Sequence, residues 1–169
     1  LLGRARARIR HPSRVRSEPT GPPTPVDRRG VISEVGQLRR RDLDASNIAL
    51  NVDVQTDLKV YANFTEVEQV TLNFVINAQQ SIEVAARARG RILIRVRAAF
   101  DWLDHGKTGV RITVADTGVG IAPNQLSRIF EPFYTTNQAV GNGFGLWLSS
   151  STVENHGGHI RKRHRPPRG

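Results

Sequence analysis

Residues 110–121 read VRITVADTGVGI, and this stretch decides how the chain is expected to fold. Val110, Ile112 and Val114 alternate with Arg or Thr, which is the period-two pattern of a strand with one buried face. Asp116 continues the buried phase, where a carboxylate is costly unless it is paired or hydrogen-bonded. Two interpretations stay open. Asp-x-Gly is common in strand-ending turns, and an inward carboxylate is also a fitting acceptor for an adenine amino group.

The same alternation predicts strands over residues 48–54 and 91–98, and the second of these is expected to pair with 110–116 as an antiparallel hairpin. Helical spacing of apolar residues predicts helices over residues 31–43, 65–88 and 145–155. Thr65 with Glu68 resembles a capping box for the second helix, and Gly90 is expected to close it. This order predicts an α/β (α+β) two-layer sandwich with a mixed, mostly antiparallel sheet and helices on one face.

The charge is concentrated at the ends of the chain, which has 169 residues and a net charge of +10. Residues 1–30 hold eight arginines, and residues 161–169 hold five basic residues. Removing these thirteen bases and the two acids of residues 1–30 leaves 12 basic and 13 acidic residues in 31–160. We expect a disordered basic arm, a near-neutral domain and a disordered basic tail, with no specific nucleic acid bound. Cysteine is absent, which excludes disulfides and thiolate metal sites.

Two asparagines lie one turn apart on the second predicted helix, whose central sequence is NFVINAQQSI. Asn73 and Asn77 are four residues apart and therefore share a helix face. The carbonyl oxygen of Asn77 is a suitable hard ligand for Mg²⁺, which usually keeps several waters and shares phosphate oxygens. The alternative is a structural amide that bonds a neighbouring backbone group.

A glycine-rich segment, GNGFGLWLSS, precedes the third predicted helix. Gly141, Gly143 and Gly145 would leave backbone N–H groups and the positive helix end available to an anion. A flexible loop is the alternative. A Rossmann site would need a strand directly before the glycines, and a P-loop would need Gly-Lys-Ser/Thr; neither is present.

Taken together, four ordered segments resemble the N, G1, F and G2 boxes of bacterial sensor histidine kinases. They are NFVINAQQSI, DTGVGI, RIFEPFYTT and GNGFGLWLSS. The resemblance covers about residues 31–160 and places the chain with the superfamily that includes DNA gyrase and the mismatch-repair ATPases. It implies a Bergerat-type ATP-binding fold, here lacking the last strands, with a short lid between Tyr134 and Val140. Phe144 stands where the family usually has leucine.

The resemblance implies an ATP site with Mg²⁺ held by Asn77, and an adenine-reading role for Asp116. The residues it assigns to ATP binding are Asn73, Asn77, Gln80, Asp116, Gly118, Gly120, Ile121, Phe130, Phe133, Gly141, Gly143, Phe144, Gly145 and Leu146. Gyrase-like relatives have a glutamate at the position of Asn73 that activates water, and an amide cannot accept a proton. The resemblance therefore favours phosphoryl transfer over hydrolysis.

The expected function is that of the catalytic domain of a two-component sensor histidine kinase, which transfers the γ-phosphoryl group of ATP to a histidine on a separate dimerisation segment or chain. His11 lies beside Pro12 among arginines and is not counted as an acceptor, so no catalytic residue is assigned. A response regulator is the expected downstream partner. The expected location is cytoplasmic, including the cytoplasmic part of a membrane-associated sensor. The alternatives are a nucleotide-binding module or degenerate fragment without transfer activity, and an anti-sigma-type serine kinase.

Overall fold

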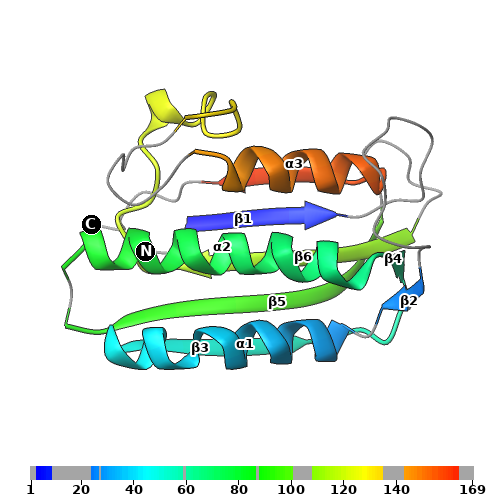
Figure 1. Cartoon of the computed structure of the whole chain (residues 1–169), viewed down its shortest axis with the longest axis horizontal. Coiled ribbons are helices and arrows are strands. Elements are labelled where there is room, and N and C mark those ends of the chain that lie inside the picture. The colour runs from blue at the N-terminus through cyan, green and yellow to red at the C-terminus, as the bar shows by residue number, and fades with distance from the viewer. Residues whose placement is uncertain are drawn as a thin grey trace.

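The chain forms a five-stranded sheet with three helices packed on one face, as the computed structural model in Figure 1 shows. The structure describes residues 3–8, 24–26, 28–58, 60–86, 88–100, 108–134 and 143–163. The sheet order is β3-β5-β6-β1-β7, and β2 pairs with β4 in a separate two-stranded sheet. The strands are β1 (Gly3–Arg8), β2 (Thr24–Val26), β3 (Ile48–Val54), β4 (Val60–Ala62), β5 (Gly90–Phe100), β6 (Thr108–Asp116) and β7 (His159–Arg163). The helices are α1 (Arg28–Ala45), α2 (Phe64–Val84) and α3 (Gly145–Asn155), with a 3-10 turn at Pro123–Gln125.

The expected hairpin is confirmed, because β5 and β6 pair antiparallel from Ile92 opposite Asp116 to Phe100 opposite Thr108. On the opposite side of β5, β3 pairs in parallel, so the sheet is mixed as predicted. The inward row of β5 lies buried under the helices and packs against Phe74 and Ile82 of α2 and their neighbours in one core. Within the described residues, no helix combines the length and apolarity needed to cross a membrane.

The start of α2 differs from the prediction. The N-cap is Asn63, whose side-chain oxygen accepts the N–H of Glu66 at 3.2 Å, so the Thr65–Glu68 capping box is wrong. Asn is among the best N-cap residues, and it satisfies a backbone donor that the helix itself cannot. The carboxylate of Glu66 also lies 2.6 Å from Nε2 of His156, which ties the start of α2 to the end of α3. Helix α2 ends at Val84, and Gly90 begins β5 rather than closing the helix.

The N-terminal segment also differs from the prediction. We expected residues 1–30 to be disordered, but Gly3–Arg8 forms β1, which lies between β6 and β7 and pairs antiparallel with both. Residues 28–30 already belong to α1. Residues 161–163, expected in a disordered tail, belong to β7. Residues 9–23 and 164–169 lie outside the described residues. Composition could not reveal β1, because its backbone hydrogen bonds go to strands more than a hundred residues away.

Strand β7 is joined to the main sheet through β1 alone. We therefore expect Ala5→Pro to loosen β7, because proline removes a backbone donor from the middle of a sheet. Ala5 pairs with Val114 on one side and Lys162 on the other. The free energy of unfolding should fall by roughly 1–3 kcal/mol, and the amides of β7 should exchange faster in hydrogen exchange measured by mass spectrometry. Ala5→Ser keeps the N–H and is the control. Unchanged protection of β7 in the proline variant would contradict the pairing.

Candidate functional site

A half-buried carboxylate lies at the end of β6, where the sequence predicted one. Oδ1 of Asp116 accepts the backbone N–H of Gly118 at 2.8 Å. Burial raises the pKa of Asp116, and hydrogen bonds from Gly118 N–H and the Ser81 hydroxyl oppose that rise. These two donors stabilise the charged form of the carboxyl group and so offset part of the effect of burial.

Ser81 of α2 supports this loop, and sequence reasoning did not select it. Its hydroxyl oxygen accepts the N–H of Gly120 at 3.3 Å, and its carbonyl accepts the N–H of Val119 at 3.0 Å. A Cβ added to Gly118 would lie 2.2 Å from the Ser81 hydroxyl oxygen and 2.4 Å from its carbonyl carbon, so only glycine fits there. One signal was available: Ser81 follows Asn77 by four residues, which puts both on one face of α2.

The two asparagines of α2 make different contacts. The amide nitrogen of Asn73 donates to the carbonyl of Gly145 at 3.2 Å and to the hydroxyl of Ser149 at 3.1 Å, which joins α2 to α3. The amide nitrogen of Asn77 donates to the carbonyl of Asn73 at 2.7 Å. This bond uses the nitrogen of Asn77 and leaves its carbonyl oxygen as the group that could bind a cation.

The surroundings of Asn77 could hold Mg²⁺ only when the metal is bound together with a nucleotide. Among the described residues there is no group of three or more His, Cys, Asp or Glu side chains that could hold a metal ion. A single amide oxygen is nevertheless sufficient when phosphate oxygens and waters supply the other ligands, as is usual for Mg²⁺. The donor set here therefore suits a metal that arrives with phosphates, and it does not suit a resident metal centre.

The glycine-rich segment leads into α3 as expected. Gly143 has a φ of +71°, and a Cβ there would lie 2.4 Å from the carbonyl carbon of Phe133. A side chain at Gly145 would approach Asn73, since a Cβ there would lie 3.7 Å from its amide carbon. The N-cap residue, Phe144, makes no side-chain hydrogen bond to the first turn of α3. Backbone N–H groups therefore face this end of the helix without a side-chain cap. Gly141 lies outside the described residues.

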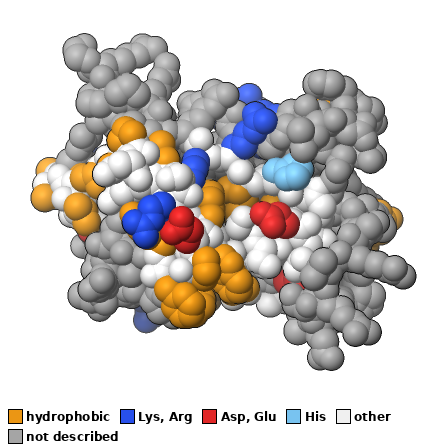
Figure 2. Space-filling model, turned by 90° about the horizontal axis from the view of Figure 1, so that it is seen from above, with side chains coloured by type: hydrophobic (Ala, Val, Ile, Leu, Met, Phe, Trp, Pro, Cys, Tyr) orange, Lys and Arg blue, Asp and Glu red, His pale blue; other side chains and the backbone are white. Residues whose placement is uncertain are grey.

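Three aromatic side chains form a connected surface beside this helix start. The rings of Phe133 and Phe144 lie 4.5 Å apart in an edge arrangement, and those of Phe144 and Trp147 lie 6.1 Å apart. Phe133 is 70% exposed, and Leu148 next to Trp147 is also exposed. We call Phe133, Phe144, Trp147 and Leu148 the aromatic surface. Figure 2 views the molecule from the side that carries α3 and shows hydrophobic side chains gathered there.

The remaining predicted site residues lie near these groups without a direct role in the contacts above. Phe130 lies under the ammonium group of Lys162 of β7, with Nζ 4.9 Å from the ring centre. Burial lowers the pKa of Lys162. Gln80 and Ile121 are half-buried, and Leu146 packs against the core. The binding roles expected for them stay predictions.

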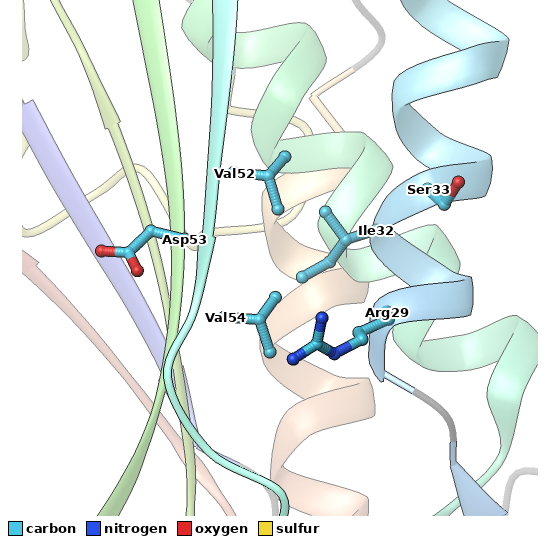
Figure 3. A pocket seen from close by; sticks show the side chains of 6 residues that line it. All are labelled: Arg29, Ile32, Ser33, Val52, Asp53 and Val54. Carbon is cyan, nitrogen blue, oxygen red and sulfur yellow. The ribbon is translucent and has the colours of Figure 1, made fainter.

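An open groove of about 590 Å³ lies elsewhere, between α1 and the edge strand β3. Figure 3 shows Ile32, Val52 and Val54 facing one another across it, whereas Asp53 points to the opposite side of the strand. It is lined by Arg29, Ile32, Ser33, Val52, Asp53 and Val54. None of the predicted nucleotide residues lines this groove, so it is separate from the site around Asp116.

Comparison with known proteins agrees with this geometry. Residues 62–169 match the family described as "Histidine kinase-, DNA gyrase B-, and HSP90-like ATPase". The chain belongs to this ATPase family. Within it, the similar proteins are sensor histidine kinases. ZraS of Salmonella typhi is 34% identical over 137 residues, which are 80% of this chain and 27% of ZraS. The chain thus spans about a quarter of the length of that relative.

Solved structures show the same fold. The catalytic domain of histidine kinase ThkA superposes with a TM-score of 0.65 and 29% identity, over 79% of this chain and 80% of that one. Full-length ShkA in complex with AMPPNP gives 0.64 and 32%, over 79% of this chain and 26% of that one. ThkA in complex with the response regulator protein TrrA gives 0.52 and 31%, over 67% and 31%. The fold is that of the histidine kinase catalytic domain.

The Ser81 hydroxyl predicts a pH-dependent effect on ATP binding. The adenine contact expected for Asp116 requires its ionised form, and on that expectation the affinity for ATP falls as the pH drops through the pKa of Asp116. In Ser81→Ala that pKa rises further because a stabilising donor is lost, and the fall therefore begins at higher pH. We expect the ratio of variant to wild-type dissociation constants to lie near one at pH 8 and to increase as the pH falls toward the pKa of Asp116. Isothermal titration across this range measures it. Ser33→Ala, at an exposed position on α1, is the control. A ratio that stays constant with pH would mean that Ser81 acts only through packing.

Proposed function

We propose that this chain binds ATP as the catalytic domain of a sensor histidine kinase and transfers the γ-phosphoryl group to a histidine on a separate dimerisation segment or chain. The observation that carries the proposal is the half-buried carboxylate of Asp116 at the end of β6, which accepts hydrogen bonds from Gly118 N–H and the Ser81 hydroxyl. A carboxylate held this way offers an acceptor to the amino group of adenine. Glycines at 118 and 120 leave room for a flat ring beside the backbone.

The start of α3 is the proposed place for the phosphates. Its first N–H groups have no cap from the side chain of Phe144, and the positive end of the helix dipole favours an anion. Asn77 would present its carbonyl oxygen to Mg²⁺, and the metal supplies neutralisation of the phosphate charge when it is bound. Gly143 and Gly145 have no side chains to occupy the space between α3, Phe133 and Asn73.

The residue at position 73, an asparagine, favours phosphoryl transfer over hydrolysis. The amide of Asn73 is engaged with Gly145 and Ser149 and has no basic group that could take a proton from water. In the proposed reaction, the bond between the γ-phosphorus and the bridging oxygen breaks and ADP leaves with the electron pair. The unprotonated nitrogen of the acceptor imidazole forms the new bond to phosphorus with its lone pair, and the other ring nitrogen releases its proton to solvent. The domain contributes positioning and charge stabilisation.

The aromatic surface is the proposed contact for the acceptor segment. Exposed apolar patches of this kind mark protein interaction sites, and this one adjoins the end of α3 at which the phosphates would lie. A helix carrying the acceptor histidine could thus pack on Phe133 and Trp147 while its imidazole faces the γ-phosphate. The response regulator would then take the phosphoryl group from that histidine. The proposed location of these events is the cytoplasm.

Asp116→Asn tests the adenine contact. The substitution places an amide donor opposite the amino group of adenine, so the dissociation constant for ATP should rise at least about tenfold, the equivalent of one lost hydrogen bond. The fold should not suffer. Because the pKa of Asp116 is raised in the folded chain, its stabilising contribution is present at low pH and lost as pH rises through that pKa. Asparagine avoids that loss, and the melting temperature at pH 7.5 should therefore not decrease. Asp57→Asn, at an exposed position, is the control. Full ATP affinity in Asp116→Asn would refute the adenine assignment.

Transfer itself is tested with a dimerisation segment from a similar sensor kinase and γ-labelled ATP. We expect acid-labile label on the acceptor histidine, dependent on Mg²⁺ and abolished by a chelator. The doubly substituted variant Trp147→Ser with Leu148→Ser should lose most of this labelling while keeping its affinity for ATP, because both side chains are exposed and neither is assigned to ATP binding. Val84→Ser, at an exposed apolar position on α2, is the matched control. ATP binding without any labelled histidine would leave a nucleotide-binding module, and label on serine would indicate the anti-sigma type of kinase.

A further inference from the structure

The face of the sheet that the helices leave uncovered carries an unusual concentration of arginine. On β5, Arg91, Arg95 and Arg97 alternate with the buried residues Gly90, Ile92, Ile94 and Val96 and therefore occupy the opposite face. Arg111 occupies the same face of β6, because Val110 and Ile112 on either side of it are buried. The sequence did not reveal this distribution, because the net charge of residues 31–160 is close to zero.

The register extends this face across the sheet. Residues directly opposite one another in paired strands share a face, and Arg111 lies opposite both Arg97 of β5 and Arg8 of β1. Arg161 of β7 lies opposite Arg6, which in turn lies opposite Thr113. We call the arginine positions on this face the arginine face: Arg4, Arg6, Arg8, Arg91, Arg95, Arg97, Arg111, Arg161 and Arg163.

Acidic groups do not balance this charge. Among the strand residues that the structure describes on this face, the sole acid is Asp53, which Figure 3 shows pointing away from α1. Its carboxylate is taken up by Arg95, with Nε and Oδ2 2.6 Å apart. Hydrogen bonding to Arg95 lowers the pKa of Asp53, so the pair stays ionised at neutral pH. Arg95 is thus paired, whereas no acidic residue lies beside Arg97 and Arg111 among the described strand positions of this face.

Two features of the arginine face cost free energy when only water covers it. Arg97 and Arg111 are like charges placed directly opposite each other, an arrangement that destabilises a sheet. The Nε of Arg111 is also buried without a hydrogen-bond partner in the described part of the chain. A buried donor left without an acceptor costs free energy. An anion placed over this pair would offset the repulsion between the two guanidinium groups.

We propose that the arginine face binds the phosphodiester backbone of nucleic acid without sequence preference. This site is independent of the proposed ATP site, which lies on the helix side of the sheet. Guanidinium groups present paired donors that match phosphate oxygens bidentately, and the cations on this face are arginines with no lysine among them. A twisted sheet is saddle-shaped, so a cylindrical duplex can follow its concave diagonal better than a flat bilayer can meet it.

The composition of the face supports the absence of sequence preference. At its described strand positions the one ring is the imidazole of His159, opposite Arg8, and there is no Phe, Tyr or Trp side chain on which bases could stack. Other residues of the face, such as Leu93, Thr113 and Ala115, are small or aliphatic. Single-strand binding proteins rely on such rings. The lack of exposed bulky apolar side chains at these positions also disfavours insertion into a membrane. Contacts to phosphates alone would produce affinity that depends strongly on salt.

Fluorescence anisotropy with a labelled 20-base-pair duplex of arbitrary sequence tests the proposal on the full chain. We expect micromolar binding at 50 mM salt, similar for a second duplex of different sequence. The double variant Arg97→Gln with Arg111→Gln should bind at least tenfold more weakly and reduce the slope of log affinity against log salt by about 2, since each lost phosphate contact removes about 0.9.

The matched control is Arg40→Gln with Arg41→Gln, which removes the same charge from exposed positions on α1 and should bind DNA as the wild type does. Unchanged ATP affinity and circular dichroism establish that each variant is folded. Three results would overturn the proposal: no DNA binding by the wild type at 50 mM salt, equal losses in both double variants, or binding to vesicles of anionic lipid without binding to DNA. An undiminished affinity in the arginine-face variant would assign the binding to the basic ends of the chain instead.

Discussion

Helices cover only one face of this sheet, and that asymmetry decides where each strand residue can lie. The period of two then separates the strands into an inward row of valine and isoleucine and an outward row rich in arginine. Asp116 belongs to the inward row by its phase, opposite buried Ile92, although it is a carboxylate. The candidate site therefore exists because the last inward position of β6 carries a polar group. The arginine face exists because the helices that the structure describes lie on the opposite side of the sheet.

An inward carboxylate needs partners, and α2 supplies one of them. Ser81 contacts the segment after Asp116 through both its hydroxyl and its carbonyl, and Gly118 lies so close that no side chain would fit. The result is a carboxyl group whose pKa is raised by desolvation and whose charged form is stabilised by local donors. Such a group lowers the stability of the chain when no ligand is bound, and it gains a hydrogen-bond partner when a ligand with a donor group binds. Binding sites commonly combine these two properties.

Much of this arrangement could be predicted from local sequence. Alternation predicted β3, β5 and β6 and their hairpin, and helical spacing predicted α1, α2 and α3, because each pattern spans enough residues to show its period. Shorter or compositionally unusual elements were missed. Strand β4 has three residues, and the Arg-Ala alternation of β1 lacks the bulky apolar side chains by which a strand is recognised. The N-cap at Asn63 was missed because Thr65 and Glu68 offered the same chemistry two residues later. Ser81 was missed because it acts through a hydrogen bond to Gly120, which lies 39 residues later in the chain. No local sequence pattern encodes such a contact.

The position of β1 links the two ends of the chain to the candidate site. Strand β7 pairs with β1 and, through it, with β6, so the N-terminal residues hold β7 in the sheet. Lys162 of β7 in turn lies against the ring of Phe130, in the segment that leads to Phe133 and the aromatic surface. A cation over an aromatic ring contributes roughly 0.5–1 kcal/mol at an exposed site and more when desolvated, and burial already lowers the pKa of Lys162. Loss of β1 would therefore remove support from Phe130 as well as from β7. The residues that composition marks as a basic arm thus contribute to the segment on which phosphoryl transfer is proposed to depend.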